Sequence, residues 1–299
     1  MPPAFPDNPS QRGRGVALMA VGGLLFAGMG AMAKLASPSV PTFELVAARS
    51  AVSWLVVELM RRAAKMPLEF QDIPMLGIRS VSGFVAIAAY FYALRYIPLG
   101  DAVLLNNASP VLTSIGAVWL LGERMTSAKI IGMATSMVGV WLLVQHRTGV
   151  LETRGALVGA ASAVAAAVAL VSLKVATRRN RSLIVVWCLA GISTVGSLLL
   201  WDSAWVWPDR HEWLLLLATG VLASAAQVFM TMGYRLLDAS EASVYSYLTP
   251  VFAVAISAWL FREPPTPATF LGGALIVASG AGVAWQSRQP QRETVQDAP

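Results

Sequence analysis

The sequence predicts an all-α integral membrane protein with ten transmembrane helices, arranged as two inverted repeats of five helices each. Three observations lead to this fold class. Hydrophobic residues make up 56% of the 299 residues and charged residues only 13%, whereas a soluble domain carries about 25% charged residues. The apolar residues gather in ten runs, each near the ~20 residues that cross a bilayer as a helix. The second half of the chain repeats the first.

The repeat is clearest in residues 100–123 and 240–263. Each stretch begins near an acid, has a proline at its middle and ends in a glutamate. The offset of 140 residues between Pro110 and Pro250 also relates other residues: Asp101 to Glu241, Trp119 to Trp259, Glu123 to Glu263, Arg95 to Arg235 and Lys34 to Lys174. Because five is odd, the second copy enters the membrane upside-down. Inverted repeats are typical of secondary transporters, whose substrate sites lie between the repeats.

In the first repeat, residues 15–147, prolines and charged residues separate the apolar runs. Lys34 lies near the end of the first run, and Pro41, Pro74 and Pro98 precede or open the next three. Proline is tolerated at the start of a helix but not in its interior. We therefore expect helices over residues 15–36, 41–60, 74–96, 100–122 and 126–145.

In the second repeat, residues 151–287, arginines at 178, 179 and 181 separate the first two runs, Pro208 precedes the third, and Pro264 and Pro265 precede the last. We expect helices over residues 151–176, 183–201, 212–237, 240–261 and 266–285. The polar ends, residues 1–14 and 288–299, are expected to be cytoplasmic tails, the second of them disordered.

The basic residues predict the orientation. With the N-terminus in the cytoplasm, most of the 22 lysines and arginines fall in loops and helix ends on the inner side. This excess is typical of a bacterial inner-membrane protein and places both termini in the cytoplasm. The same clustering at helix ends argues against a nucleic-acid partner for the net charge of +6.

The run from Asn107 to Val140, with Pro110, the Leu-Gly-Glu of residues 121–123 and Gly132, resembles the signature of the drug/metabolite transporter superfamily, EamA type. Residues 248–283 carry a second copy, with Phe-Arg-Glu in place of Leu-Gly-Glu. The resemblance covers essentially the whole chain and implies a ten-helix export carrier of the inner membrane. Its general look is closest to bacterial amino-acid exporters, including those for aromatic amino acids.

The resemblance also has a departure. Small multidrug members of the superfamily have a glutamate within the first helix that exchanges protons for cationic drugs. The first expected helix of this chain contains no acid, which puts proton antiport by that mechanism in doubt.

Lys34 and Arg49 are the notable cations within the expected helices. A charge inside a membrane helix costs roughly 2.5–3.5 kcal/mol on insertion scales, so each needs a compensating partner. One interpretation is a structural ion pair of Lys34 with Glu44 across the short link between the first two helices. The alternative is that Lys34 or Arg49 meets a substrate carboxylate.

Polar residues recur at the same place in both repeats. Asn106 and Asn107 lie one turn before Pro110, and Ser246 and Tyr247, with Tyr245 beside them, lie one turn before Pro250. Proline frees a backbone carbonyl, so these residues are candidates for a substrate cavity, and both prolines are candidate hinges. Gln227 in the eighth helix is a further candidate. The alternative is that these groups hydrogen-bond neighbouring helices.

Aromatic residues suggest the kind of substrate. Tyr90 on the third helix and Tyr245 and Tyr247 on the ninth would favour apolar or aromatic side chains if they line a cavity. The alternative for such rings is the aromatic belt at the membrane interface.

Four acids near helix ends have simpler interpretations. Asp101 and Glu241 lie in first turns, where a carboxylate complements the helix dipole. Glu123 and Glu263 lie beside Arg124 and Arg262 and are expected to form local ion pairs.

The sequence contains no signature of an enzyme, a metal site or a cofactor site, since its two histidines, His146 and His211, fall in expected loops and no HExxH pair occurs. We expect an exporter of amino acids, aromatic and other bulky neutral ones, working by alternating access as a facilitative or weakly coupled carrier. The alternative is proton-coupled efflux of other metabolites or amphipathic drugs. We expect a cavity enclosed by the third, fourth, eighth and ninth helices. One chain holds both halves, so a monomer suffices.

Overall fold

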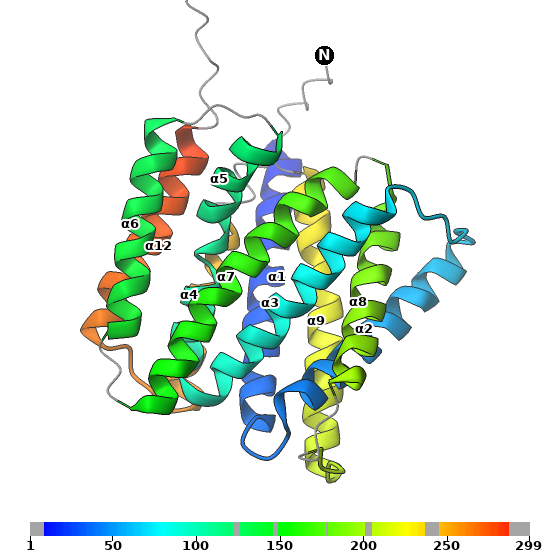
Figure 1. Ribbon diagram of the computed structural model, residues 1–299, viewed down its shortest axis with the longest axis horizontal. Helices are drawn as coiled ribbons and strands as arrows, with labels where there is room; N and C mark the ends of the chain where they lie inside the picture. Colours follow the sequence, from blue (N-terminus) through cyan, green and yellow to red (C-terminus); the bar gives the residue numbers. More distant parts are fainter. Residues whose placement is uncertain are drawn as a thin grey trace, which may run out of the picture.

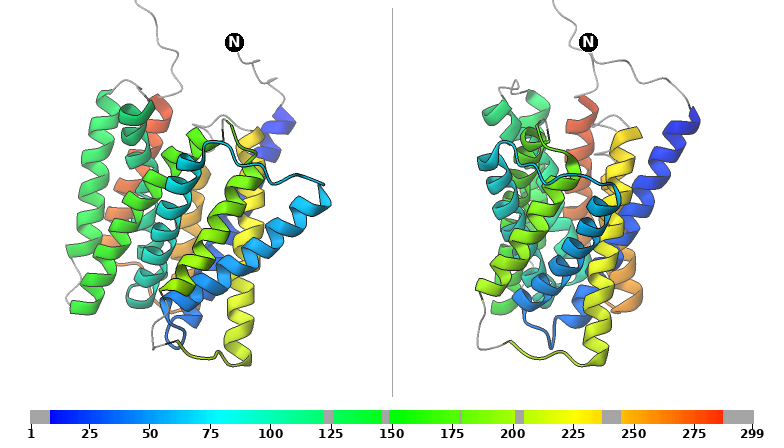
Figure 2. Two further views of the ribbon diagram at one scale, coloured as in Figure 1. Left: turned by 45° about the vertical axis from the view of Figure 1, so that its right-hand side comes forward. Right: turned by 90° about the vertical axis from the view of Figure 1, so that its right-hand side faces the viewer.

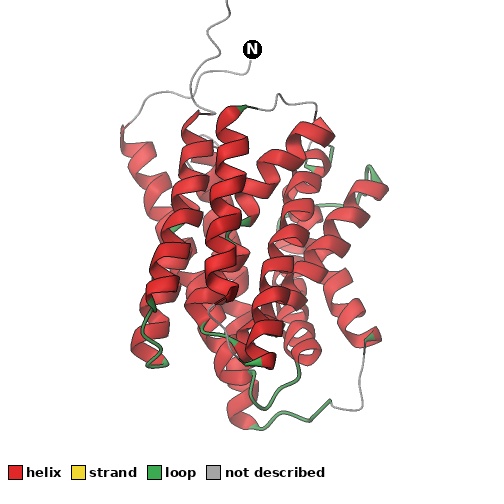
Figure 3. Cartoon of the chain, turned by 60° about the vertical axis from the view of Figure 1, so that its left-hand side comes forward, coloured by secondary structure: helices red, strands yellow, loops and turns green. Residues whose placement is uncertain are grey.

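A computed structural model of the chain describes residues 9–121, 126–145, 149–177, 179–200, 205–236 and 245–286. Throughout these ranges the regular structure is α-helical (Figures 1 and 3). By length and composition, five of the described helices can cross a membrane, and three shorter helical stretches are also apolar. The chain is therefore an α-helical membrane protein, as the composition predicts. The tail predicted over 288–299 and most of the N-terminal tail lie outside the described residues.

The first repeat begins with three long helices and continues with a broken one. The helices are α1 (Pro9–Ala36), α2 (Thr42–Ala63), α3 (Ile73–Tyr96), α4 (Leu99–Asn106), α5 (Ser109–Leu121) and α6 (Ser127–Gln145). The fourth span, expected to be continuous, is divided between α4 and α5 at Asn107 and Ala108. The physical reason is Pro110, whose ring nitrogen cannot donate to the carbonyl of Asn106 and whose ring crowds the preceding turn.

The second repeat contains α7 (Val150–Ala176), α8 (Ser182–Leu199), α9 (Arg210–Leu236), α11 (Leu248–Leu260) and α12 (Pro267–Gln286). An offset of 140 residues brings α1, α2, α3, α5 and α6 onto these five helices within a few residues at each end. The agreement extends to the break, because the chain makes a turn at Tyr247, the position equivalent to Asn107.

Helix packing follows the same two-fold relationship (Figures 1 and 2). The most extensive contacts are α1 with α9 and α3 with α7, which exchange under the offset, and α6 with α12 and α2 with α8 pair each helix with its own equivalent. A Cβ on Gly159 would meet Ala93 at 3.2 Å, and a Cβ on Gly233 would meet Met19 at 2.7 Å. These two close contacts are equivalent positions. The two repeats are therefore inverted copies that pack face to face.

The bundle is packed unequally at its two ends. We call the end where α1 begins the Arg14 end and the end where α1 finishes the Lys34 end. The largest cluster of buried side chains draws on the last turns of α1 (Ala27–Ala36), the last turns of α3 (Phe91–Leu94) and nearly all of α4, with the first turns of α9 (Leu215–Ala223). All of these segments lie toward the Lys34 end. The other two clusters of buried residues, around Met19 and around Leu76, are much smaller.

Candidate functional site

Lys34 lies in a polar cluster that closes the Lys34 end. Its ammonium donates to the Ile97 carbonyl at 2.7 Å and forms an ion pair with Glu263 at 3.0 Å, above the ring of Phe261. The second oxygen of the Glu263 carboxylate accepts from Ser257 at 2.9 Å. These contacts join the ends of α1 and α3 in the first repeat to the end of α11 in the second. We call Lys34, Ile97, Glu263 and Ser257 the Lys34 latch.

The latch replaces two expected ion pairs. Lys34 pairs with Glu263 rather than with Glu44, and Glu263 pairs with Lys34 rather than with its neighbour Arg262. Glu44 is buried, 3% exposed, and accepts from the backbone N–H of Val206 at 3.2 Å. Sequence spacing suggested nearby partners, whereas the inverted repeat brings together residues that are more than 200 positions apart.

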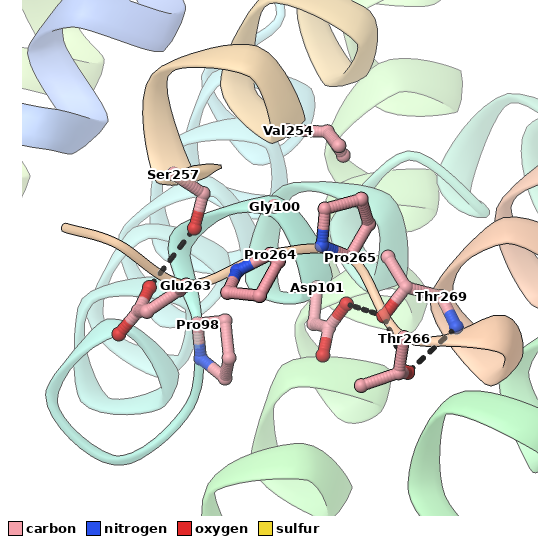
Figure 4. Close-up of a pocket in the computed structure, with 10 residues that line it drawn as sticks. All are labelled: Pro98, Gly100, Asp101, Val254, Ser257, Glu263, Pro264, Pro265, Thr266 and Thr269. Carbon is pink, nitrogen blue, oxygen red and sulfur yellow. Dashed lines mark hydrogen bonds between the residues drawn. The ribbon is translucent and has the colours of Figure 1, made fainter. Parts of the chain in front are cut away.

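Asp101 makes a second link between the repeats beside the latch (Figure 4). Its carboxylate is 2% exposed and accepts from the Thr269 hydroxyl of α12 at 2.8 Å. Asp101, Glu263 and Ser257 line a small pocket with Pro98, Pro264 and Pro265. Asp101 therefore does more than complement the α4 dipole, because it ties α4 to α12. The equivalent Glu241 and the expected Glu123–Arg124 pair lie outside the described residues.

Arg49 and Tyr90 lie close to one another between α2 and α3. The guanidinium of Arg49 stands 5.9 Å from the centre of the Phe91 ring, and its Nε is buried without a hydrogen-bond partner. The Tyr90 hydroxyl reaches α1, since a Cβ on Gly30 would lie 2.7 Å from it. Tyr90 therefore spans from α3 to α1 near the Lys34 end.

The two asparagines make different contacts. Asn106 donates to the Ser162 hydroxyl of α7 at 3.0 Å, and Ser162 in turn donates to the Gly159 carbonyl. Asn107 donates to the Val103 carbonyl of its own helix at 2.8 Å, at the break before Pro110. Both side chains are half-buried. Asn106 therefore bridges to a neighbouring helix, and Asn107 stabilises the end of α4.

The equivalent positions in the second repeat are aromatic. Tyr245 and Ser246 are half-buried, and Tyr245 packs against Met19. Tyr247 is 3% exposed and points at α12, because a Cβ on Gly280 would overlap its hydroxyl. Gln227 is half-buried in the middle of α9, and Pro250 is buried in α11. The candidates therefore surround the interior at several depths rather than meeting at one point.

Sequence reasoning placed Arg79 at the inner helix ends and missed its burial. Arg79 is 8% exposed in α3, and its Nε has no hydrogen-bond partner. Its guanidinium lies beside Gly83, since a Cβ there would be 2.6 Å from Nη1. The side chain thus runs toward the membrane centre. The glycine one turn further along the helix was a signal of this in the sequence, because it leaves space for a long side chain.

Comparison with known proteins adds the family. The profile of the EamA-like transporter family matches residues 13–145 and again residues 153–285. The chain is 34% identical over 267 residues to the pseudopaline exporter of Pseudomonas aeruginosa, covering 89% of this chain and 94% of that protein. It is 27% identical over 289 residues to a riboflavin transporter of Vibrio cholerae, covering 94% and 96% of the two chains.

A solved crystal structure has the same architecture, with a TM-score of 0.66 at 26% identity, covering 92% of this chain and 99% of the other. The family match spans both halves of the chain and falls on the two copies that the offset of 140 residues defines. The protein is a multi-pass membrane transporter rather than an enzyme, and it belongs to the EamA-like transporter family.

Proposed function

We propose that this protein exports small organic metabolites, bulky and aromatic amino acids among them, from the cytoplasm across a bacterial inner membrane by alternating access. The observation that carries the proposal is the unequal packing of an otherwise symmetric bundle. α1 contacts α3 near Gly30, Tyr90 and Lys34. Over their described residues, the equivalent helices α7 and α9 are not among the packed pairs.

A transporter made of inverted repeats opens at either end by exchanging the arrangements of its two halves. Contacts that are present at one end and lacking at the other correspond to one of the two states. Here the Lys34 end is closed. With both termini in the cytoplasm, the Lys34 end faces outward, and this state receives substrate from the cytoplasm, as an exporter requires.

The half-buried residues Tyr90, Asn106, Gln227 and Tyr245 support a route through the interior. Exposure of polar groups to lipid is costly, so partly exposed polar side chains at mid-depth are expected to face a water-filled space. Aromatic rings at the same depths suit a substrate with an apolar or aromatic group. Among the described residues, no buried acid stands apart from the Lys34 end where a cationic drug would need one.

A second candidate is export of a larger metabolite. It is favoured by the relatives named as a pseudopaline exporter and a riboflavin transporter, both of which align with nearly the whole chain. The two candidates share the route and the mechanism and differ in the cargo.

The test is transport by the purified full-length protein in liposomes, with labelled phenylalanine, tryptophan, leucine, riboflavin and a cationic dye, with and without a pH gradient. Amino-acid flux that is independent of the gradient supports the first candidate. Flux of riboflavin alone supports the second. Dye flux that requires the gradient contradicts both and indicates a proton-coupled drug carrier.

A further inference from the structure

Two arginines remain inside the membrane with no counter-charge. Among the described residues, every other buried or half-buried cation with a printed ion pair has an acidic partner: Lys34 has Glu263, and Arg61 has Glu58. Arg49 and Arg79 have neither an ion pair nor a side-chain hydrogen bond in the described part of the chain, and the Nε atoms of both are buried. An unpaired guanidinium in this environment is destabilising, so its presence calls for a ligand.

Arg79 does not escape to the membrane surface. Long basic side chains near the end of a transmembrane helix usually extend toward the interface and leave their charge in water. Arg79 lies six residues into α3, but its Nη1 lies beside Gly83, one turn deeper, and near Leu189 of α8. The charge is therefore directed into the bundle, where Gly83 provides the space.

Arg49 occupies the other half of the membrane. Its guanidinium is beside Phe91, which lies about 18 Å beyond Arg79 along α3 at ~1.5 Å per residue. Arg79 therefore belongs to the Arg14 half and Arg49 to the Lys34 half. The neighbours of Arg49, Phe91 and Tyr90, are aromatic, so an apolar group could pack there while its charged group meets the guanidinium.

We propose that Arg79 and Arg49 are two successive binding positions for the carboxylate of an organic anion. This inference rests on the proposed export function and specifies its cargo. A guanidinium binds a carboxylate through paired hydrogen bonds, and one arginine neutralises one carboxylate. A phosphate monoester carries more charge than a single guanidinium balances, and the distance along α3 prevents both arginines from binding it together. The carboxylate binds Arg79 when the Arg14 end is open and Arg49 before release at the Lys34 end.

The transport test uses full-length protein in liposomes, with phenylalanine and phenylalaninamide as probes that differ only at the carboxylate. We expect wild-type protein to move phenylalanine at least about tenfold faster, the scale of losing a charge-assisted hydrogen bond. Arg79→Gln and Arg49→Gln should abolish that preference, and Arg79→Lys should retain part of it. Gly83→Ala should also weaken it, because the added methyl group displaces the guanidinium of Arg79. The control is Arg62→Gln, because the Arg62 side chain is 73% exposed.

Thermal stability distinguishes a binding role from a structural one. Removal of a buried, unpaired charge leaves a protein equally or more stable, so Arg79→Gln should keep or raise the melting temperature of the purified protein while transport falls. A lower melting temperature together with an unchanged carboxylate preference would overturn the proposal.

A binding measurement keeps the inference testable if no probe is transported, an outcome that counts against the amino-acid form of the proposed function alone. Millimolar benzoate, phenylalanine and citrate are added separately to the purified protein, and the shift in melting temperature is recorded. Stabilisation by at least one carboxylate that is lost in Arg79→Gln and Arg49→Gln but kept in Arg62→Gln supports the proposal. No stabilisation, equal stabilisation in all variants, or stabilisation by inorganic phosphate alone overturns it.

Discussion

The ion pair of Lys34 with Glu263 is the contact by which a single residue most directly controls access. It joins the two repeats at the closed end, with the two side chains 13% and 30% exposed. A partly buried pair costs desolvation energy that its mutual attraction offsets, so removal of either partner leaves a charge poorly compensated. Lys34 and Glu263 therefore favour the closed arrangement of the Lys34 end.

We predict that Lys34→Gln and Glu263→Gln each open this end more often. The measurement is the rate at which a membrane-impermeant maleimide labels Val254→Cys, on the wall of the pocket beside the latch, after Cys188, the only native cysteine, is replaced by alanine. We expect labelling several-fold faster in each variant, and little further increase in the double variant, because both remove the same interaction. Additive effects of the two substitutions would show that the ion pair is not the closing contact.

At the scale of helices, the closest approach of backbones occurs between α6 and α12. A Cβ on Gly139 would lie 2.6 Å from the Gly272 carbonyl oxygen, and a Cβ on Gly272 would lie 2.7 Å from that of Gly139. Small residues allow such approaches in lipid. Backbone atoms cannot move aside as a flexible side chain can, so a methyl group here must separate the helices.

We predict that Gly139→Ala destabilises the protein by about 1–3 kcal/mol, the usual cost of overpacking, and lowers the melting temperature in detergent. The matched control is Gly77→Ala in α3, where a Cβ would meet nothing within 4 Å. That substitution should be neutral or stabilising by about 0.5–1 kcal/mol, because alanine favours the helix. Equal effects of the two substitutions would contradict the packing argument.

The break in the fourth span is the other feature at this scale. We predict that Pro110→Ala, which restores a backbone donor and removes the ring clash, straightens the junction of α4 and α5 and slows turnover several-fold while substrate binding is retained. The control is Pro267→Ala at the first position of α12, where proline is tolerated and its loss should leave turnover unchanged. Normal turnover in Pro110→Ala would exclude the break as a hinge.

The sequence predicted the helices and the repeat well, because apolar length and a constant offset are local or one-dimensional signals. It placed Pro110 correctly but treated the fourth span as one helix, although proline is its only breaker. It could not supply the partner of Lys34, because Glu263 approaches only when the inverted halves pack. Nor could it identify the burial of Arg79, which depends on the direction taken by a flexible side chain. Residue-level contacts between the repeats are three-dimensional information that periodicity does not contain.

At the scale of the whole molecule, the bundle is two-fold symmetric in its helices but asymmetric in its packing. The core lies at the Lys34 end, and the equivalent set of contacts at the Arg14 end is not assembled to the same extent. Two states related by symmetry must differ by only a few kcal/mol if both are to be populated during transport. An exchange of the packed end is therefore the minimal motion that the fold requires.

Equivalent cysteine pairs can measure this exchange in one protein. In a background without Cys188, one double variant carries cysteines at Gly30 and Tyr90, which meet between α1 and α3, and the other carries them at Leu170 and Met230, the positions 140 residues further on in α7 and α9. In the state described here, a short thiol cross-linker should join the first pair efficiently and the second pair poorly. Transported substrate should raise cross-linking of the second pair as it lowers that of the first, because closing one end accompanies opening the other. If both pairs react equally and neither responds to any transported substrate, the two ends do not alternate, and the inverted repeat would have to serve the bundle only as architecture.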